Sequence, residues 1–163
     1  MSGLFIISSY FSYTFFSGEF QMKAVSDFFL GSALGFLMIP LHEWLHGIAY
    51  KMMGAPKVDY RANWKKLVFY AAADGYTAGY KEFRFVALLP FSVITILGLT
   101  VMVWSGFEWA VLMFGLILSH AACCGGDFGL LSFMYEHKDR GIVTLDDMAK
   151  KETLFMVIQD EIA

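Results

Sequence analysis

Two long stretches without charge restrict this chain to folds that can lie in a membrane. Residues 85–107 contain 23 consecutive residues with no charged side chain, and residues 109–126 contain another 18. A helix needs roughly 20 such residues to cross a hydrocarbon core about 30 Å thick. Only 17% of all residues are charged, whereas soluble domains average about 25%. The sequence therefore predicts an integral membrane protein surrounded by the lipid bilayer.

A third apolar segment, residues 28–50, has the length of a span but contains His42, Glu43 and His46. Pro40 lies in the same segment, where a proline weakens the hydrogen-bond ladder and kinks a helix. The fold class predicted is a mainly α membrane protein with about three transmembrane helices, at residues 24–53, 85–104 and 109–135. The polar residues make the first of these helices the place to look for function.

Between the first two spans, residues 57–84 predict a β-hairpin at the membrane surface. Val, Tyr and Phe residues favour strands, and the small residues AAADGYTAG at 71–79 are expected to form the turn. The aromatic residues 1–23 are expected to form an interfacial segment, and the sequence leaves open whether they add a fourth span. Residues 136–163 are charged and are expected to form a solvated cytoplasmic tail. We therefore expect a single domain over the whole chain, with its core at residues 24–135.

The positions of lysine and arginine predict the orientation. Seven lie in or beside the loop after the first span, four lie in the tail, and only Lys23 lies on the opposite side. Because cytoplasmic loops are enriched in these residues, the hairpin and the C-terminus are expected in the cytoplasm. His42, His46 and Asp127 then lie at similar depth near that face and can meet. The net charge is -3 and no dense basic cluster is present, so nucleic acid is not an expected partner.

Residues 42–46 read HEWLH, an H-E-x-x-H pattern on the first expected helix. Histidines four residues apart project from one helix face about 6 Å apart along the axis, so both imidazoles can bind one tetrahedral metal ion. Glu43 lies one position round, where it can accept a proton from water as a general base. Ionisable residues in a span are costly and usually carry function. The alternative is a polar cluster that joins helices by hydrogen bonds.

A catalytic zinc ion needs a third protein ligand and an open position for water. His120 and Asp127 are the candidates, and their separation places them on one helix face roughly 10 Å apart. Asp127 follows a flexible Gly-Gly pair and is our choice, with a helix N-cap as its alternative role. His120 is then expected to donate a hydrogen bond to the substrate carbonyl or the developing oxyanion, and it is also the strongest competing ligand. Cys123 and Cys124 are interpreted as packing residues.

Several motifs together resemble a known family. HEWLH, the strand-like loop, LLP at residues 88–90 and GGD at residues 125–127 resemble the small zincin peptidases of bacterial membranes, which are in turn similar to the intramembrane site-2 metalloproteases. The resemblance covers residues 24–151. The chain departs from the site-2 pattern, because GGD stands in place of LDG, the accompanying prolines are absent, and His120 stands where an asparagine is expected.

The resemblance implies a Zn²⁺ ion bound by His42, His46 and Asp127, with Glu43 as the general base. We therefore expect an integral membrane zinc metalloprotease that cleaves a membrane protein or peptide near the cytoplasmic face of a bacterial membrane. One alternative is a metal-binding or haem-binding protein in which His42, His46 and His120 hold the cofactor without hydrolysis. Another is a pseudoprotease that binds a partner as a scaffold.

Overall fold

The computed structural model describes residues 18–63, 68–147 and 152–157. The expectation for residues 1–17 therefore lies outside the described part of the chain. The elements in chain order are α2 (Gly18–Leu37), α3 (Ile39–Met52), β1 (Asp59–Asn63), β2 (Val68–Ala72), β3 (Thr77–Gly79), α4 (Tyr80–Trp104), α5 (Phe107–Cys123), α6 (Gly125–His137), the 3₁₀ turn η1 (Lys138–Arg140), β4 (Ile142–Asp147) and β5 (Glu152–Val157). The predicted mainly helical fold is confirmed, and two small antiparallel sheets accompany the helices.

Four of the helices form two bent pairs. α2 and α3 meet at Met38 with a bend of 42°, and α5 and α6 meet at Cys124 with a bend of 47°. The first break lies two residues before Pro40, which occupies the first turn of α3, where its missing N–H is tolerated. The predicted kink is therefore confirmed. The single helix expected over residues 24–53 is wrong in its bounds, because helix begins at Gly18 and is interrupted at Met38.

Glycines allow α2 and α5 to pack closely. Gly31 of α2 lies against the backbone carbonyl of Leu112 in α5, and Gly115 of α5 lies in the same way against the carbonyl of Phe28. Gly35, one turn further along α2, also faces α5. A Cβ atom at Gly31 or Gly115 would overlap the backbone of the other helix. Small residues at this spacing are typical of closely packed membrane helices.

β1 and β2 form the predicted hairpin. They pair antiparallel, with Asn63 opposite Val68 at the end nearest the connection. The connection of this hairpin therefore falls at residues 64–67, and not at residues 71–79 as predicted. Residues 71–79 instead complete β2, turn at Ala73–Tyr76, where Gly75 has a φ of 68°, and form β3. Their small side chains allow close packing in the interior, as the fully buried Ala73 shows.

The segment after residue 136 contains β4 and β5, and the prediction of a solvated tail at residues 136–163 is wrong for β4, which is largely buried. β4 lies between β3 and β5 in an antiparallel sheet. Ile142 and Val143 of β4 are buried, and Ile142 packs with Phe83 of α4 and Met134 of α6. The prediction failed because charged residues flank these short strands, whereas the pattern of apolar residues within them decides their burial.

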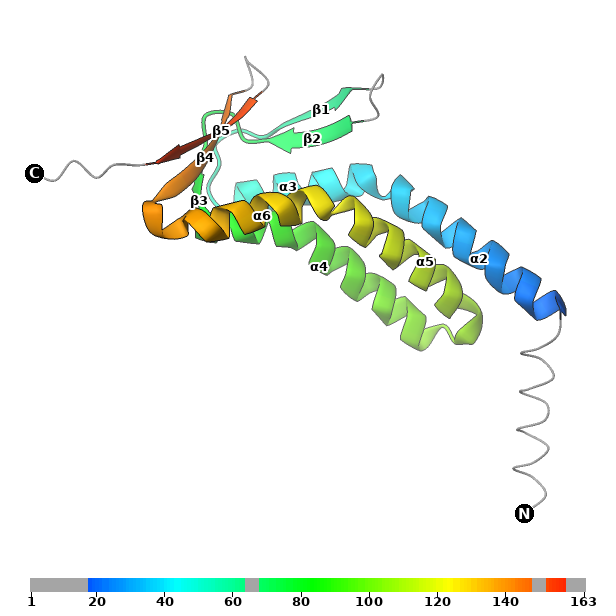
Figure 1. Ribbon diagram of the computed structural model, residues 1–163. Coiled ribbons are helices and arrows are strands. Elements are labelled where there is room, and N and C mark those ends of the chain that lie inside the picture. The colour runs from blue at the N-terminus through cyan, green and yellow to red at the C-terminus, as the bar shows by residue number, and fades with distance from the viewer. Residues whose placement is uncertain (1–17, 64–67, 148–151, 158–163) are drawn as a thin grey trace, which may run out of the picture.

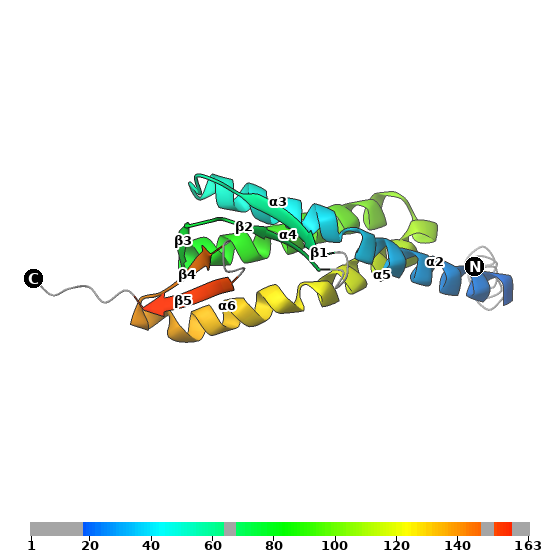
Figure 2. The same ribbon diagram turned by 90° about the horizontal axis from the view of Figure 1, so that it is seen from above.

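Both sheets lie on the same side of the helices and toward one end of the molecule (Figure 1). Seen from above, β1 and β2 lie beside α3, and β4 and β5 lie beside α6 (Figure 2). The sheets leave the other end of the helices uncovered. This end consists of α2, α5 and the second half of α4, and we call it the bare helical half. Its exposed large apolar side chains include Phe29, Phe36, Ile96, Val103 and Trp104.

Length and hydropathy support the predicted spans in part. Within the described residues, α4 alone is a single helix long and apolar enough to cross a membrane. Each of the two bent pairs also qualifies when it is counted as one span, which brings the total to three.

Candidate metal centre

Two imidazoles from α3 face a carboxylate from α6 at the centre of the molecule. His42 and His46 lie one turn apart on α3, and Asp127 lies in the first turn of α6. His42 Nε2 is 2.9 Å from His46 Nε2 and 3.1 Å from Asp127 Oδ2. Asp127 Oδ1 is 3.4 Å from His46 Nε2. The structure thus brings together the three residues that the sequence predicted as metal ligands, and we call them the ligand group.

The two helix breaks position these side chains. α3 begins at Ile39, shortly before His42, and α6 begins at Gly125, shortly before Asp127. Each break therefore places one of these two side chains near the N-terminus of a helix. Asp127 makes no side-chain capping bond at the start of α6 and contacts the two imidazoles instead. The alternative role of Asp127 as a helix N-cap is therefore wrong.

The hydrogen-bonding partner of His46 suits a metal ligand. His46 Nδ1 is 2.9 Å from the backbone oxygen of Val86. A carbonyl oxygen only accepts, so Nδ1 carries the proton and Nε2 of the neutral ring presents a lone pair to the ligand group. This leaves the lone pair of His46 facing the Asp127 carboxylate, an arrangement that a cation stabilises.

The spacing of the ligand group fits zinc. Atoms bound about 2.0–2.1 Å from a tetrahedral zinc ion lie about 3.3 Å from one another. His42 Nε2 lies 2.9 Å from His46 Nε2 and 3.1 Å from Asp127 Oδ2, and His46 Nε2 lies 3.4 Å from the other carboxylate oxygen, Oδ1. Two imidazole nitrogens and one carboxylate are also a donor set that zinc prefers in catalytic sites. That these residues bind zinc stays a prediction.

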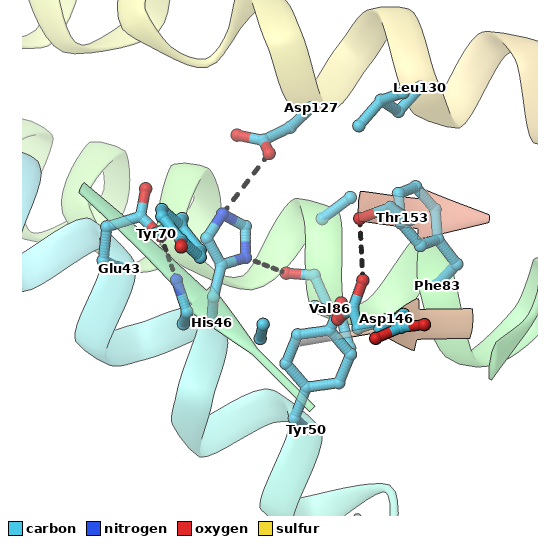
Figure 3. A pocket seen from close by; sticks show the side chains of 14 residues that line it. Glu43, His46, Tyr50, Tyr70, Phe83, Val86, Asp127, Leu130, Asp146 and Thr153 are labelled. Atoms are coloured by element: carbon cyan, nitrogen blue, oxygen red, sulfur yellow. Dashed lines mark hydrogen bonds and ion pairs between the residues drawn. The ribbon is translucent and has the colours of Figure 1, made fainter. Parts of the chain in front are cut away.

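Glu43 lies beside the ligand group and is anchored elsewhere. Its Oε2 accepts a hydrogen bond of 2.9 Å from the backbone N–H of Ala71 in β2. Figure 3 shows Glu43 and His46 lining one cavity, with Asp127 above them on α6. Because the backbone bond engages one carboxylate oxygen, the other can accept a proton. This position is compatible with the general base predicted from the sequence.

His120 lies behind His42, on the side of the ring away from Asp127. Its Nε2 is 3.1 Å from His42 Nδ1, and Cys124 Sγ is 3.8 Å from the same nitrogen. His120 and Cys124 are fully buried. Asp127 therefore joins His42 and His46, whereas His120 forms a second group with His42 and Cys124. The role of His120 as an oxyanion donor stays a prediction.

A cavity of about 370 Å³ lies on the sheet side of the ligand group (Figure 3). Its walls come from α3, β2, α4 and α6, and also from Asp146, Asp147 and Thr153 of the β4–β5 hairpin. Asp146 is held in place by hydrogen bonds from the Ala73 N–H at 3.1 Å and the Thr153 hydroxyl at 2.8 Å. Sequence reasoning missed these residues. The apolar run IVTL before the aspartates was the signal that could have revealed a buried strand.

A second cavity of about 240 Å³ lies between the two helix breaks. It is lined by Ile39, His42, Glu43, His120, Cys123, Gly126 and Asp127. Glu43 and Asp127 line both cavities, so the ligand group stands between them.

A family model with the description "Putative zincin peptidase" matches residues 35–141, about two thirds of the chain. The chain belongs to this family. The matched region contains α3, α4 and α6, and therefore every residue of the ligand group, and it ends immediately before β4. Membership of the zincin peptidase family indicates zinc-dependent metallopeptidase activity. Comparisons with curated proteins and with solved structures gave no significant match.

Proposed function

We propose that this chain is an integral membrane zinc metallopeptidase, similar to the site-2 proteases, that hydrolyses a peptide bond near the cytoplasmic face of a bacterial membrane. One observation carries the proposal: the convergence of His42, His46 and Asp127 beside Glu43, at the edge of a cavity. His42, His46 and Asp127 would hold the zinc ion as its three protein ligands.

Zinc supplies Lewis-acid chemistry when bound, which activates water and polarises the substrate carbonyl. Glu43 accepts the proton of the attacking water on the carboxylate oxygen that Ala71 does not hold. The same carboxyl group then delivers the proton to the leaving amine nitrogen as the C–N bond breaks. The hydrogen bond from Ala71 keeps the carboxyl group beside the ligand group during both transfers.

β2 supports binding of an extended substrate. Tyr70, Ala71 and Ala72 line the cavity next to Glu43, and within the described residues β2 pairs with another strand only on its β1 side. A helical substrate must unwind before cleavage because its amides are hydrogen-bonded internally. The unwound segment can then lie in the cavity beside β2, where the Ala71 N–H remains bonded to Glu43. The proposed substrate is therefore a membrane protein or peptide with a segment that can become extended.

Three features support the placement in a membrane. α4 contains an 18-residue window with a mean hydropathy of 2.4, and the two bent pairs pass the same test when each is one span. The bare helical half exposes large apolar side chains. Among the residues that the structure describes, every lysine and arginine except Lys23 belongs to a segment at the sheet end or beside it. We infer that the sheets and the C-terminus face the cytoplasm.

Glu43→Gln tests the proposed function in purified protein in detergent. We expect about one zinc ion per chain in both wild type and variant by elemental analysis, because Glu43 is not a proposed ligand. Wild type should cleave labelled casein or a peptide library, and Glu43→Gln should lose about 10²–10⁴-fold in rate. The exposed Glu136 of α6 provides the control, and Glu136→Gln should retain full activity.

Two outcomes would contradict this proposal. Full proteolysis by Glu43→Gln would exclude Glu43 as the base. Bound zinc in wild type without cleavage of any substrate would favour the pseudoprotease scaffold.

The geometry disfavours a haem carrier. The alternative requires axial histidines such as His46 and His120 on either side of the haem. The ring of His42 occupies the space between them, with centroids 4.5 Å from His46 and 5.2 Å from His120. A Soret band in the purified protein would overturn this argument, and a colourless zinc protein would support the peptidase.

A further inference from the structure

His42 has a partner at each of its two ring nitrogens. Nε2 faces the ligand group, with His46 Nε2 at 2.9 Å and Asp127 Oδ2 at 3.1 Å. Nδ1 faces His120 Nε2 at 3.1 Å. His42 is 6% exposed and His120 is fully buried. Both rings also line the cavity of about 240 Å³ between the two helix breaks.

The proton in this contact decides whether His42 can bind a metal. One ring must donate and the other must accept. When His42 donates from Nδ1, its Nε2 presents a lone pair to the ligand group. When His120 donates, the proton of neutral His42 sits on Nε2 and blocks that lone pair. Metal binding through Nε2 therefore requires His120 to be the acceptor.

We propose that His120 is a positioning residue, which accepts the Nδ1 proton of His42 and so holds its ring and tautomer ready to bind zinc through Nε2. The proposal rests on the zinc metallopeptidase function above. It assigns His120 neither the role of a ligand nor that of an oxyanion donor.

The break between α5 and α6 creates this arrangement. His120 lies in the last turn of α5 and Asp127 in the first turn of α6, so one bent helix pair reaches both nitrogens of His42. Cys124 stands at the break and steadies His120: its S–H donates to the His120 backbone oxygen at 3.2 Å. Its sulfur is also 3.9 Å from both ring nitrogens of His120.

Two substitutions of His120 separate hydrogen bonding from packing. His120→Gln keeps an acceptor oxygen near the position of Nε2, whereas His120→Leu fills similar space and cannot accept. We expect His120→Leu to lower zinc affinity 10–100-fold in competition with a chelator, and His120→Gln to recover most of the loss. His137 provides the control, since its ring contacts the Phe133 backbone oxygen at the end of α6. His137→Gln should leave zinc affinity unchanged.

A second measurement needs no variant. In zinc-loaded wild type, the ¹⁵N chemical shifts of His42 should show a proton on Nδ1 and the metal on Nε2. The reverse assignment would overturn the proposal. So would unchanged zinc affinity in a folded His120→Leu variant, or the loss of one imidazole from the Co²⁺ coordination shell of that variant, which is the signature of a direct ligand.

These readouts distinguish this proposal from the proposed function. A chain that binds zinc with the expected dependence on His120 but cleaves no substrate would refute the peptidase and support the positioning role. A wild-type chain that binds neither Zn²⁺ nor Co²⁺ would overturn both.

Discussion

The carboxylate of Asp127 supplies the negative charge that two neutral imidazoles lack. Its two oxygens reach His42 at 3.1 Å and His46 at 3.4 Å. A divalent cation at this point gains one full charge interaction and two nitrogen ligands in a largely buried setting, where electrostatic interactions are stronger than in water. The charge of Asp127, and not only its shape, should therefore control metal binding.

Asp127→Asn keeps the shape of the side chain and removes its charge. We expect the variant to lose zinc affinity by about 100-fold or more, a larger loss than a change in a residue that only supports a ligand. Chelator competition on purified protein measures this effect. Asp139→Asn, at an exposed position in η1 after the same helix, is the control. Wild-type affinity in Asp127→Asn would return the role of third ligand to His120.

At the scale of elements, the sequence predicts the helices better than it predicts the strands and turns that pack against them. Apolar runs long enough to span are recognisable because every residue contributes to the pattern, and Pro40 marks the first break. The turn of the hairpin was misplaced because Gly and Ala at residues 71–79 suit both a turn and a tightly packed strand. β4 and β5 were missed because each is only six residues long, and their burial depends on α4 and α6, which are distant in sequence.

The contact between α2 and α5 allows a direct test of helix packing. A Cβ at Gly31 or Gly115 overlaps backbone atoms of the opposite helix, so the helices must separate to admit alanine. We expect Gly31→Ala and Gly115→Ala to lose about 1–3 kcal/mol of stability, despite a gain of about 0.5–1 kcal/mol in helix propensity. At this chain length each kcal/mol lowers Tm by about 2–4 °C.

Gly129 of α6 is the matched control for these substitutions. A Cβ at this position meets nothing within 4 Å, so Gly129→Ala should keep or slightly raise Tm in detergent. Equal Tm values for all three variants would show that the close approach of α2 and α5 does not contribute to stability.

At the scale of the whole molecule, the site is the meeting point of distant segments. HEWLH identifies His42, Glu43 and His46 because its spacing alone places them on one helix turn. Asp127 was preferred to His120 as the third ligand by a second argument, namely that Asp127 is expected at a similar depth in the membrane to His42 and His46. The partner of His42 Nδ1 and the cavity wall formed by β4 and β5 follow only from the bend at Cys124 and from the pairing of β3 with β4. Sequence patterns report spacing within an element, and they do not report such angles and pairings between elements.

The orientation of the whole chain can be tested by cysteine labelling in a Cys123→Ala background, since Cys124 is fully buried. Ser105 lies at the turn between α4 and α5, at the end of the molecule opposite the sheets, whereas Asp139 lies at the sheet end after α6. Both positions are exposed.

Because lysine and arginine concentrate at the sheet end, Ser105→Cys should face the outside and Asp139→Cys should face the cytoplasm. A membrane-impermeant maleimide should therefore label Ser105→Cys in intact spheroplasts and Asp139→Cys only after lysis. Inverted vesicles should give the opposite pattern. The reverse result would place the ligand group near the outer face, and labelling of both positions in spheroplasts would contradict insertion.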